Sequence, residues 1–213
     1  MRILILIDGN NFIASVNNVC KERKCKRSID YYKLHHFILE YLKNNPNFNS
    51  QKLHHLRTYF YTGEYSYSTI SRIEYECQKS KFKEKVKKDF CHAKKAQLNF
   101  FKKAKEFNFF EIRTKPLQYT QKNGVFQKGV DVQIAVDMAS FAYQDNYDVI
   151  VLLSGDVDLL ESAKLIKSLG KQLVIMAHYK TVSEEMKRIS DLYIELNKLH
   201  DKQLDQFSHL AIA

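Results

Sequence analysis

The sequence predicts an α/β fold with a central, mostly parallel sheet that is covered by helices on both faces. Residues 149–153 form a short apolar run rich in β-branched side chains, which is typical of a strand buried on both faces. A second run of this kind, at residues 3–7, opens the chain. From there, strand-like and helix-like segments alternate, as they do in a sheet whose parallel strands are joined by crossover helices.

The N-terminal part of the chain is predicted to alternate strands and helices. Asn10 or Asn11 is expected near the cap of the first helix, because short polar side chains bond the free N–H groups of a first turn. Asp30 is expected to cap the next helix, whose apolar residues recur at helical spacing. The expected elements are a strand at 3–7, a helix from 10 to about 19, a basic loop at 21–27, a helix at about 31–43 and a strand at 53–61.

Residues 79–105 form the basic centre of the chain. Lysines dominate this segment, and its apolar residues recur near helical spacing, so an amphipathic helix is expected, broken once near residues 89–91. The lysine face of this helix can follow a phosphate backbone, or it can be an ordinary solvated face. The segment is therefore a candidate nucleic-acid contact with a purely structural alternative.

The C-terminal part continues the alternation. Asn123-Gly124 is a tight-turn pair, so residues 117–127 are expected to form a hairpin or a loop. The helix at 132–143 is apolar on most sides and is expected to be well buried. The other expected elements are strands at 109–114, 149–153, 173–177 and 192–196, a helix at 159–169 ended by Gly170, and a short helix at 183–189. Because no linker or repeat interrupts this order, residues 1–213 are expected to form a single domain.

The composition favours a polyanionic partner. The chain of 213 residues carries 34 Lys and Arg against 24 Asp and Glu, a net charge of +10. RNA is the expected partner, DNA is the alternative, and an anionic membrane surface is less favoured. The apolar opening is far shorter than the ~20 residues that a spanning helix needs, so a cytoplasmic protein is expected. The cysteines match no standard zinc spacing and are expected to be reduced thiols.

Acidic side chains follow the predicted buried strands. Asp8 comes directly after the first strand, Asp156 and Asp158 follow the strand at 149–153, and Asp131 stands at the start of a helix. Ligands of open α/β sheets bind beyond the carboxyl ends of the strands, so these side chains are expected to share one site. Grouped carboxylates repel one another unless a hard cation joins them. Each aspartate alone also suits a helix cap, and their joint placement is what favours a metal site.

Three motifs carry a resemblance to a known family. They are Ile7-Asp8-Gly9-Asn10-Asn11, Lys128-Gly129-Val130-Asp131-Val132 with Asp137-Met138, and Ser154-Gly155-Asp156-Val157-Asp158. Together they resemble the NYN domain family, the LabA-like branch of the PIN-like nucleases, over nearly the whole chain. Gly170-Lys171 and residues 183–191 are similar to the closing pattern of that family. The resemblance implies a PIN-like three-layer α/β/α sandwich.

The resemblance also implies the site residues and the cofactor. The catalytic and metal-binding acids would be Asp8, Asp131, Asp156 and Asp158, with Mg²⁺ or Mn²⁺ as the cofactor. The substrate-binding positions would be Asn11, Ser154 and Lys128, although Lys128 also suits a solvated loop. Asp137 is an additional candidate acid, which either faces the metal or holds the fold.

The implied activity is metal-dependent hydrolysis of phosphodiester bonds in RNA, with single-stranded RNA favoured and endonucleolytic action expected. The expected products are a 5′-phosphate and a 3′-hydroxyl. Four tyrosines near the end of the strand at 53–61 either stack on unpaired bases or pack locally. They are Tyr59, Tyr61, Tyr65 and Tyr67.

Two other functions compete with the nuclease hypothesis. The first is a non-catalytic RNA-binding or regulatory scaffold module of the same fold, and a homo-oligomer or a regulatory protein partner is compatible with either function. The second is a phosphatase of the haloacid dehalogenase type, which also begins with a strand and an aspartate. That chemistry needs a second aspartate two residues after the first, where this chain has Asn10, so it is disfavoured.

Overall fold

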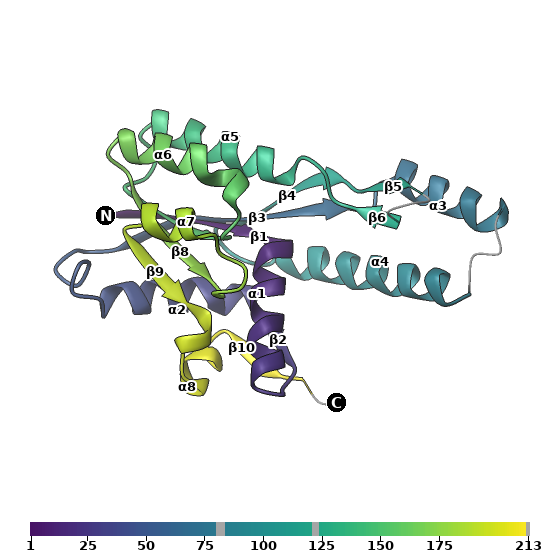
Figure 1. Ribbon diagram of the computed structural model, residues 1–213, viewed down its shortest axis with the longest axis horizontal. Coiled ribbons are helices and arrows are strands. Elements are labelled where there is room, and N and C mark those ends of the chain that lie inside the picture. The colour runs from purple at the N-terminus through teal and green to yellow at the C-terminus, as the bar shows by residue number, and fades with distance from the viewer. Residues whose placement is uncertain (80–83, 121–123, 212–213) are drawn as a thin grey trace.

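The computed structural model describes residues 1–79, 84–120 and 124–211, and its centre is a six-stranded sheet of parallel strands (Figure 1). The strand order is β4-β3-β1-β7-β8-β9. These strands are β1 (Arg2–Asp8), β3 (His54–Glu64), β4 (Phe110–Pro116), β7 (Val149–Leu153), β8 (Gln172–Ala177) and β9 (Leu192–Glu195). The predicted parallel α/β architecture is confirmed.

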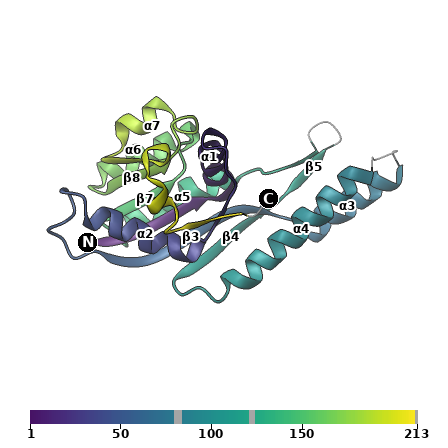
Figure 2. The same ribbon diagram turned by 90° about the horizontal axis from the view of Figure 1, so that it is seen from below.

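Helices cover both faces of this sheet, which makes the fold a three-layer α/β/α sandwich. In Figure 1, α5 and α6 lie above the sheet and α2 lies below it. The helices are α1 (Gly9–Glu22), α2 (Tyr31–Lys43), α3 (Tyr67–Lys79), α4 (Glu84–Ala104), α5 (Val130–Tyr143), α6 (Leu160–Ser168), α7 (Glu184–Ile189) and α8 (Asp201–Leu204). Figure 2 shows α3 and α4 extending away from the sheet as an arm.

The alternation of side chains along β1 produces two separate hydrophobic cores. Ile3, Ile5 and Ile7 belong to the core beneath α1 and α2. Leu4 and Leu6 belong to the core beneath α5 and α6. Successive side chains of a strand point to opposite faces, so an unbroken apolar run is what a strand covered on both faces requires.

Two expectations about helices are wrong. The segment 89–91 does not break the basic helix, because α4 is continuous from Glu84 to Ala104. The helix at 132–143 begins earlier, at Val130, and is not buried on most sides: Val132 is 66% exposed and Val136 is 57% exposed. Its buried face is narrow and consists of Val130, Ile134, Met138 and Ala142. Composition alone is a poor guide to the burial of this helix. Only the apolar residues that recur at helical spacing on one face contact the core, and the other apolar residues lie on exposed faces.

Several short elements were not predicted. Residues 21–27 are not one loop, because α1 reaches Glu22 and strand β2 (Arg27–Ile29) begins at Arg27. Strand β2 pairs with β10 (Ser208–Leu210), close to the C-terminus. The predicted hairpin is present as the antiparallel strands β5 (Gln118–Thr120) and β6 (Gly124–Phe126), while Asn123 lies outside the described residues.

Cys20, Cys25 and Cys91 are free thiols, and the side chain of Cys77 lies outside the description. None of the helices in the described ranges is long and apolar enough to cross a membrane.

Candidate functional site at the carboxyl edge of the sheet

The order in which strands are added to the sheet changes direction between β1 and β7, its two central strands. From β1 the chain builds outward through β3 to β4, and it then returns to the other side of β1 and builds outward through β7, β8 and β9. Ligands of open α/β sheets bind at such a switch point, in the crevice outside the carboxyl ends of the two central strands. In this chain Asp8 ends β1 and Ser154 directly follows β7 at that crevice.

Asp8 is a buried carboxylate at the beginning of α1. Its side chain is the N-cap of the helix: Oδ1 accepts the N–H groups of Asn10 and Asn11, both at 3.1 Å. Asn10 and Asn11 thus lie near the cap, as predicted, and donate to it, while the capping side chain itself is that of Asp8. Only 3% of Asp8 is exposed, and this burial raises its pKa to about 6 despite the hydrogen bonds from the backbone. The negative charge of Asp131 raises the pKa further.

Asn11 and Ser154 hold the backbone of the loop that carries the other acids. The Asn11 side-chain oxygen accepts the N–H of Gly155 at 3.3 Å, and the Ser154 hydroxyl oxygen accepts the N–H of Asp156 at 3.3 Å. The Ser154 hydroxyl also lies 3.4 Å from Oδ2 of Asp8. Both side chains, predicted to bind substrate, are thus engaged in positioning the loop.

Gly155 fits a space that no other residue can occupy. A Cβ built at this position would lie 2.3 Å from the Cα of Val182 and 2.5 Å from the carbonyl oxygen of Thr181. Gly155 also forms a parallel bridge with Val182. The close approach of these two backbones fixes the loop after β7 at the edge of the crevice.

Asp131 approaches the same edge from the opposite layer. It lies in the first turn of α5, behind Gly129, which adopts the left-handed φ of +79° and begins the helix. Partial burial raises the pKa of Asp131, and the charges of Asp156 and Asp158 raise it further. Asp131 is therefore electrostatically coupled to each of the other three candidate acids.

Asp156 and Asp158 lie on a short turn beyond β7. The side chain of Asp156 caps the 3₁₀ turn η1 (Val157–Leu159), and its Oδ1 accepts the N–H of Asp158 at 3.1 Å. Asp156 is half-buried, whereas Asp158 is exposed. The side chain of Asp156 is therefore held by a hydrogen bond to the backbone, whereas the side chain of Asp158 is exposed to solvent.

The donor chemistry of this edge fits a hard divalent cation. All four side chains offer carboxylate oxygens, and the negative charges of neighbouring acids raise the pKa of Asp8 and of Asp131. Within the described ranges, no three His, Cys, Asp or Glu side chains lie close enough together to ligate one ion directly. Mg²⁺ is commonly held by only one or two carboxylates together with water and substrate phosphate, so these acids suit such a site.

Asp137 is engaged away from the crevice. Its Oδ2 lies 2.5 Å from Nη1 of Arg113, on β4. The Arg113 guanidinium also stacks over the ring of Tyr59, 4.2 Å from its centroid, and its Nε donates to Glu111 at 2.9 Å. This ion pair ties α5 to the outer strand of the sheet. Of the two roles that the sequence left open for Asp137, the geometry favours holding the fold.

The remaining candidates differ in exposure. Lys128 is exposed in the segment before α5, where it is free to reach a phosphate. Tyr59 and Tyr61 are buried and pack in the core, so in this arrangement they offer no surface to a base. Tyr65 contacts the ring of Phe90 edge to face, with 5.2 Å between centroids, and Tyr67 is exposed.

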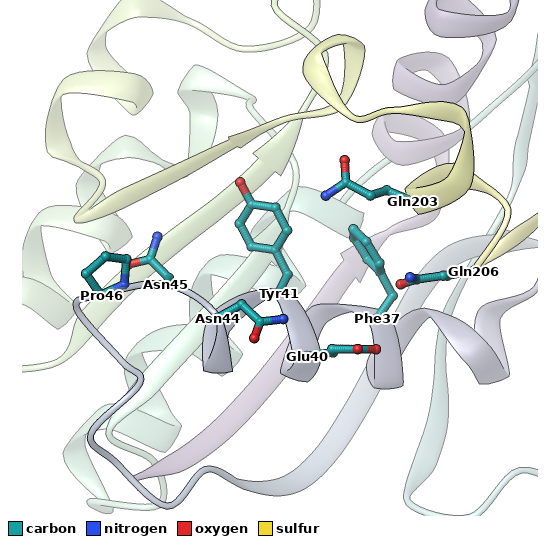
Figure 3. A pocket seen from close by; sticks show the side chains of 8 residues that line it. All are labelled: Phe37, Glu40, Tyr41, Asn44, Asn45, Pro46, Gln203 and Gln206. Carbon is teal, nitrogen blue, oxygen red and sulfur yellow. The ribbon is translucent and has the colours of Figure 1, made fainter.

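A cavity of about 240 Å³ between α2 and the C-terminal segment is separate from the acidic edge (Figure 3). In Figure 3, Phe37 and Tyr41 project from α2 toward the segment that carries Gln203 and Gln206. Its described lining contains none of the four candidate acids. We assign no role to this cavity in the chemistry of the edge.

Comparisons with known proteins agree with the fold and the motifs. The family model described as the NYN domain matches residues 2–197. The chain is 30% identical over 95 residues to the low amplitude and bright protein LabA of Synechococcus elongatus, and this match covers 42% of the chain and 50% of LabA. The chain thus spans about half the length of that curated relative. The crystal structure of a Vibrio parahaemolyticus protein of unknown function superposes with a TM-score of 0.54 at 17% identity, covering 98% of this chain and 96% of that one.

Proposed function

This chain belongs to the NYN domain family, a family of PIN-like nucleases, and from that premise we propose that it is a metal-dependent endoribonuclease acting on single-stranded RNA. The observation that carries the proposal is the position of Asp8 and Asp156 beyond the paired central strands β1 and β7, with Asp131 in the first turn of α5 near enough for its charge to raise the pKa of Asp8. Perturbed acids gathered in a crevice are a recognised sign of a catalytic site. We further propose that residues 1–213 act as one nuclease domain.

The proposed cofactor is Mg²⁺ or Mn²⁺, with carboxylate oxygens of Asp8, Asp131, Asp156 and Asp158 as its ligands, some of them directly and the others through bound water. Such an ion, when bound, lowers the pKa of a water nucleophile and offsets negative charge on the leaving oxygen. The Oδ1 atom of Asp8 accepts two backbone N–H groups, so Oδ2, toward which only the Ser154 hydroxyl is seen to donate among the described residues, is the oxygen proposed to bind the ion. Asn11 and Ser154 hold the loop of Asp156 in position for this chemistry, through their hydrogen bonds to its backbone.

RNA as the substrate is supported by charge. The net charge of +10 favours binding to a phosphate backbone, and Lys128 is exposed beside the helix that carries Asp131. We propose cytoplasmic RNA as the substrate, cleaved to leave a 5′-phosphate and a 3′-hydroxyl. The net charge alone does not favour RNA over DNA, so single-stranded DNA belongs in the assay as a competitor.

The deciding experiment is cleavage of end-labelled single-stranded RNA with Mg²⁺, Mn²⁺ or EDTA, with the chemistry of the product ends mapped. Asp8→Asn and Asp156→Asn are expected to lose at least about 100-fold in rate, as is usual when a group that stabilises developing charge is removed. Glu161→Gln, an exposed acid on α6, is the matched control and should cleave like the wild type. RNA that is bound but not cut by the wild type with either metal would instead support the non-catalytic binding module.

A further inference from the structure

A second cavity, of about 430 Å³, lies beside α1 on the face that packs against α4. Its volume is within the usual range for a small-ligand site, about 300–1,000 Å³. Aromatic rings form one wall: the centroid of Tyr31 is 4.9 Å from that of Phe60 and 5.1 Å from that of Phe100. Phe60 and Phe100 meet edge to face at 5.0 Å, and Phe101 extends the lining. Phe60 is buried at the base of this wall, whereas Tyr31, Phe100 and Phe101 are partly exposed and present the flat rings on which an unpaired base stacks.

Phe60 connects the aromatic cavity to the acidic edge. Gly9 follows Asp8 in the chain, and a Cβ built on Gly9 would lie 2.7 Å from Cζ of Phe60. The Phe60 ring is therefore packed against the first residue of α1, in a contact that only glycine permits. The cavity that Phe60 lines is thus one side chain away from the residue next to Asp8.

The cavity also offers hydrogen-bonding groups. Arg27 lines it, and its Nε is buried with no hydrogen-bond partner among the described residues. The side chain of Arg27 is only 3% exposed and is fixed by Asp205, 2.6 Å from Nη1. Asn17 and Ser28 contribute an amide and a hydroxyl to the same lining. The edges of a nucleobase carry the carbonyl, ring-nitrogen and amino groups that such side chains bind.

A basic cavity continues from the aromatic one toward the C-terminal end of α1. It has a volume of about 1,040 Å³ and shares Asn17 and Arg27 with the aromatic cavity. Its other charged lining residues are Lys21, Lys24 and Lys26. Figure 1 shows α1 running from the end of β1 down toward the C-terminus of the chain. Asp8 at the start of α1, the aromatic cavity beside this helix and the lysines at its end therefore follow one another in space.

We propose that the aromatic cavity holds one unpaired nucleobase of the RNA strand whose neighbouring phosphodiester lies at Asp8, and that the strand continues over the lysines beyond α1. This assignment rests on the proposed function, since it sets the position of the base relative to the cleaved bond. An aromatic wall next to a cationic track is the usual arrangement for binding a single strand. The RNA strand is bound by the fit of its base to the cavity and by stacking on the aromatic rings. The buried Arg27 side chain selects among the bases.

The test measures binding separately from cleavage. The full chain is titrated in EDTA with labelled single-stranded RNA decamers that carry one abasic site at each position in turn. Ala96→Trp fills the cavity from α4, and Leu98→Trp places the same side chain on the same helix at a 57% exposed position that does not line the cavity. Phe100→Leu removes the flat ring while keeping an apolar side chain, in case Ala96→Trp fails to fold.

The proposal expects one abasic position to weaken binding by about 5- to 100-fold, the range given by stacking on one base. Ala96→Trp or Phe100→Leu should weaken the intact decamer to the same degree and abolish the dependence on that position, and Leu98→Trp should behave like the wild type. Equal binding of every abasic decamer by the wild type would overturn the proposal and leave the cavity to another occupant, such as a peptide. Adenosine or uridine monophosphate binding as tightly as the decamer would overturn the assignment to an RNA strand.

Cleavage assays on the same proteins separate this inference from the proposed function. If no metal supports cleavage but the single base dependence persists, the nuclease assignment fails and the base site stands. If RNA is cleaved at the acids without any base dependence of binding, the base site fails and the nuclease assignment stands.

Discussion

The Ser154 hydroxyl donates toward Oδ2 of Asp8 across 3.4 Å, and these two residues end the two central strands of the sheet. Strands β1 and β7 are paired in parallel, with Ile7 opposite Leu153, so the next residue of each chain segment reaches the same edge. Residues that are 146 positions apart are thereby brought together by strand order alone. The acidic site depends on this single pairing.

Removal of the buried charge of Asp8 is expected to stabilise the metal-free protein above neutral pH. Burial raises the pKa of Asp8 to about 6, above its unfolded value, so the folded chain binds this proton more tightly than the unfolded chain does. The stability that comes from this proton is full below about pH 4 and is lost as the pH rises through about 6. Asp8→Asn should then gain up to about 3 kcal/mol over the wild type at pH 8, because asparagine also caps α1 well.

Thermal unfolding of the wild type and Asp8→Asn in EDTA, followed from pH 4 to pH 8, measures this difference. The two unfolding curves should converge at the acidic end and separate as the pH rises. A constant difference between the proteins at every pH would mean that Asp8 is not the group whose protonation changes stability.

Divalent cations are expected to raise the melting temperature of the wild type. An ion that binds only the folded chain stabilises it by about 2.7 kcal/mol at one hundred times its dissociation constant. Asp131→Asn removes the acid that is coupled to the other three, so it should lose most of this gain. Melting curves over a titration of MgCl₂ or MnCl₂ measure the effect, with Glu161→Gln as the control. Equal shifts in wild type and Asp131→Asn would count against an ion at this edge.

Gly155→Ala is expected to displace the loop that carries Asp156. The new Cβ would collide with backbone atoms of Val182 and Thr181, which cannot move as a side chain can. Overpacking of this kind costs about 1–3 kcal/mol, and a displaced Asp156 should reduce cleavage at least tenfold. Gly124→Ala, where open space surrounds the position, carries only the strain of its positive φ. Urea unfolding and cleavage rates compare the two, and unchanged cleavage in Gly155→Ala would refute the positioning role of the loop.

The ion pair between Asp137 and Arg113 is expected to contribute to stability and not to chemistry. Asp137→Ala leaves the largely buried Arg113 guanidinium with Glu111 but without its contact to α5, at a cost of up to about 3 kcal/mol. The double variant Asp137→Ala with Arg113→Met should regain part of that loss, because the guanidinium is then absent and Glu111 keeps Arg57 as a partner. Urea unfolding measures the stability of each variant, and the cleavage rate and metal requirement of the folded fraction should stay unchanged. A large fall in cleavage rate without a loss of stability would move Asp137 into the catalytic group.

The core of the fold is strongly encoded in local patterns. Residues 149–153 form β7 with the predicted limits, because an unbroken β-branched run has few alternatives to a fully buried strand. The start of α5 was placed two residues late, since Gly129 begins this helix through its backbone conformation and not through a polar capping side chain. No local sequence pattern predicts the pairing of β2 with β10, because each strand is short and its partner is distant in the chain.

The candidate site was only partly predictable from the sequence. The acids Asp8 and Asp156 follow buried strands, and this position alone marked them as candidates. Asn11 and Ser154 were expected to contact substrate, but their backbone bonds depend on the packing of α1 against the loop after β7, which no local pattern specifies. No local sequence pattern predicts the aromatic cavity, because its walls come from separate elements, with Tyr31 on α2 and Phe100 on α4.

Asp8 belongs to the layer of α1, while Asp131 opens α5 in the layer on the other side of the sheet. The negative charge of Asp131 raises the pKa of Asp8, so the two helical layers interact electrostatically across the end of the sheet. A cation at the proposed site would be attracted by both layers at once, and it would link α1 to α5 in addition to supplying the chemistry.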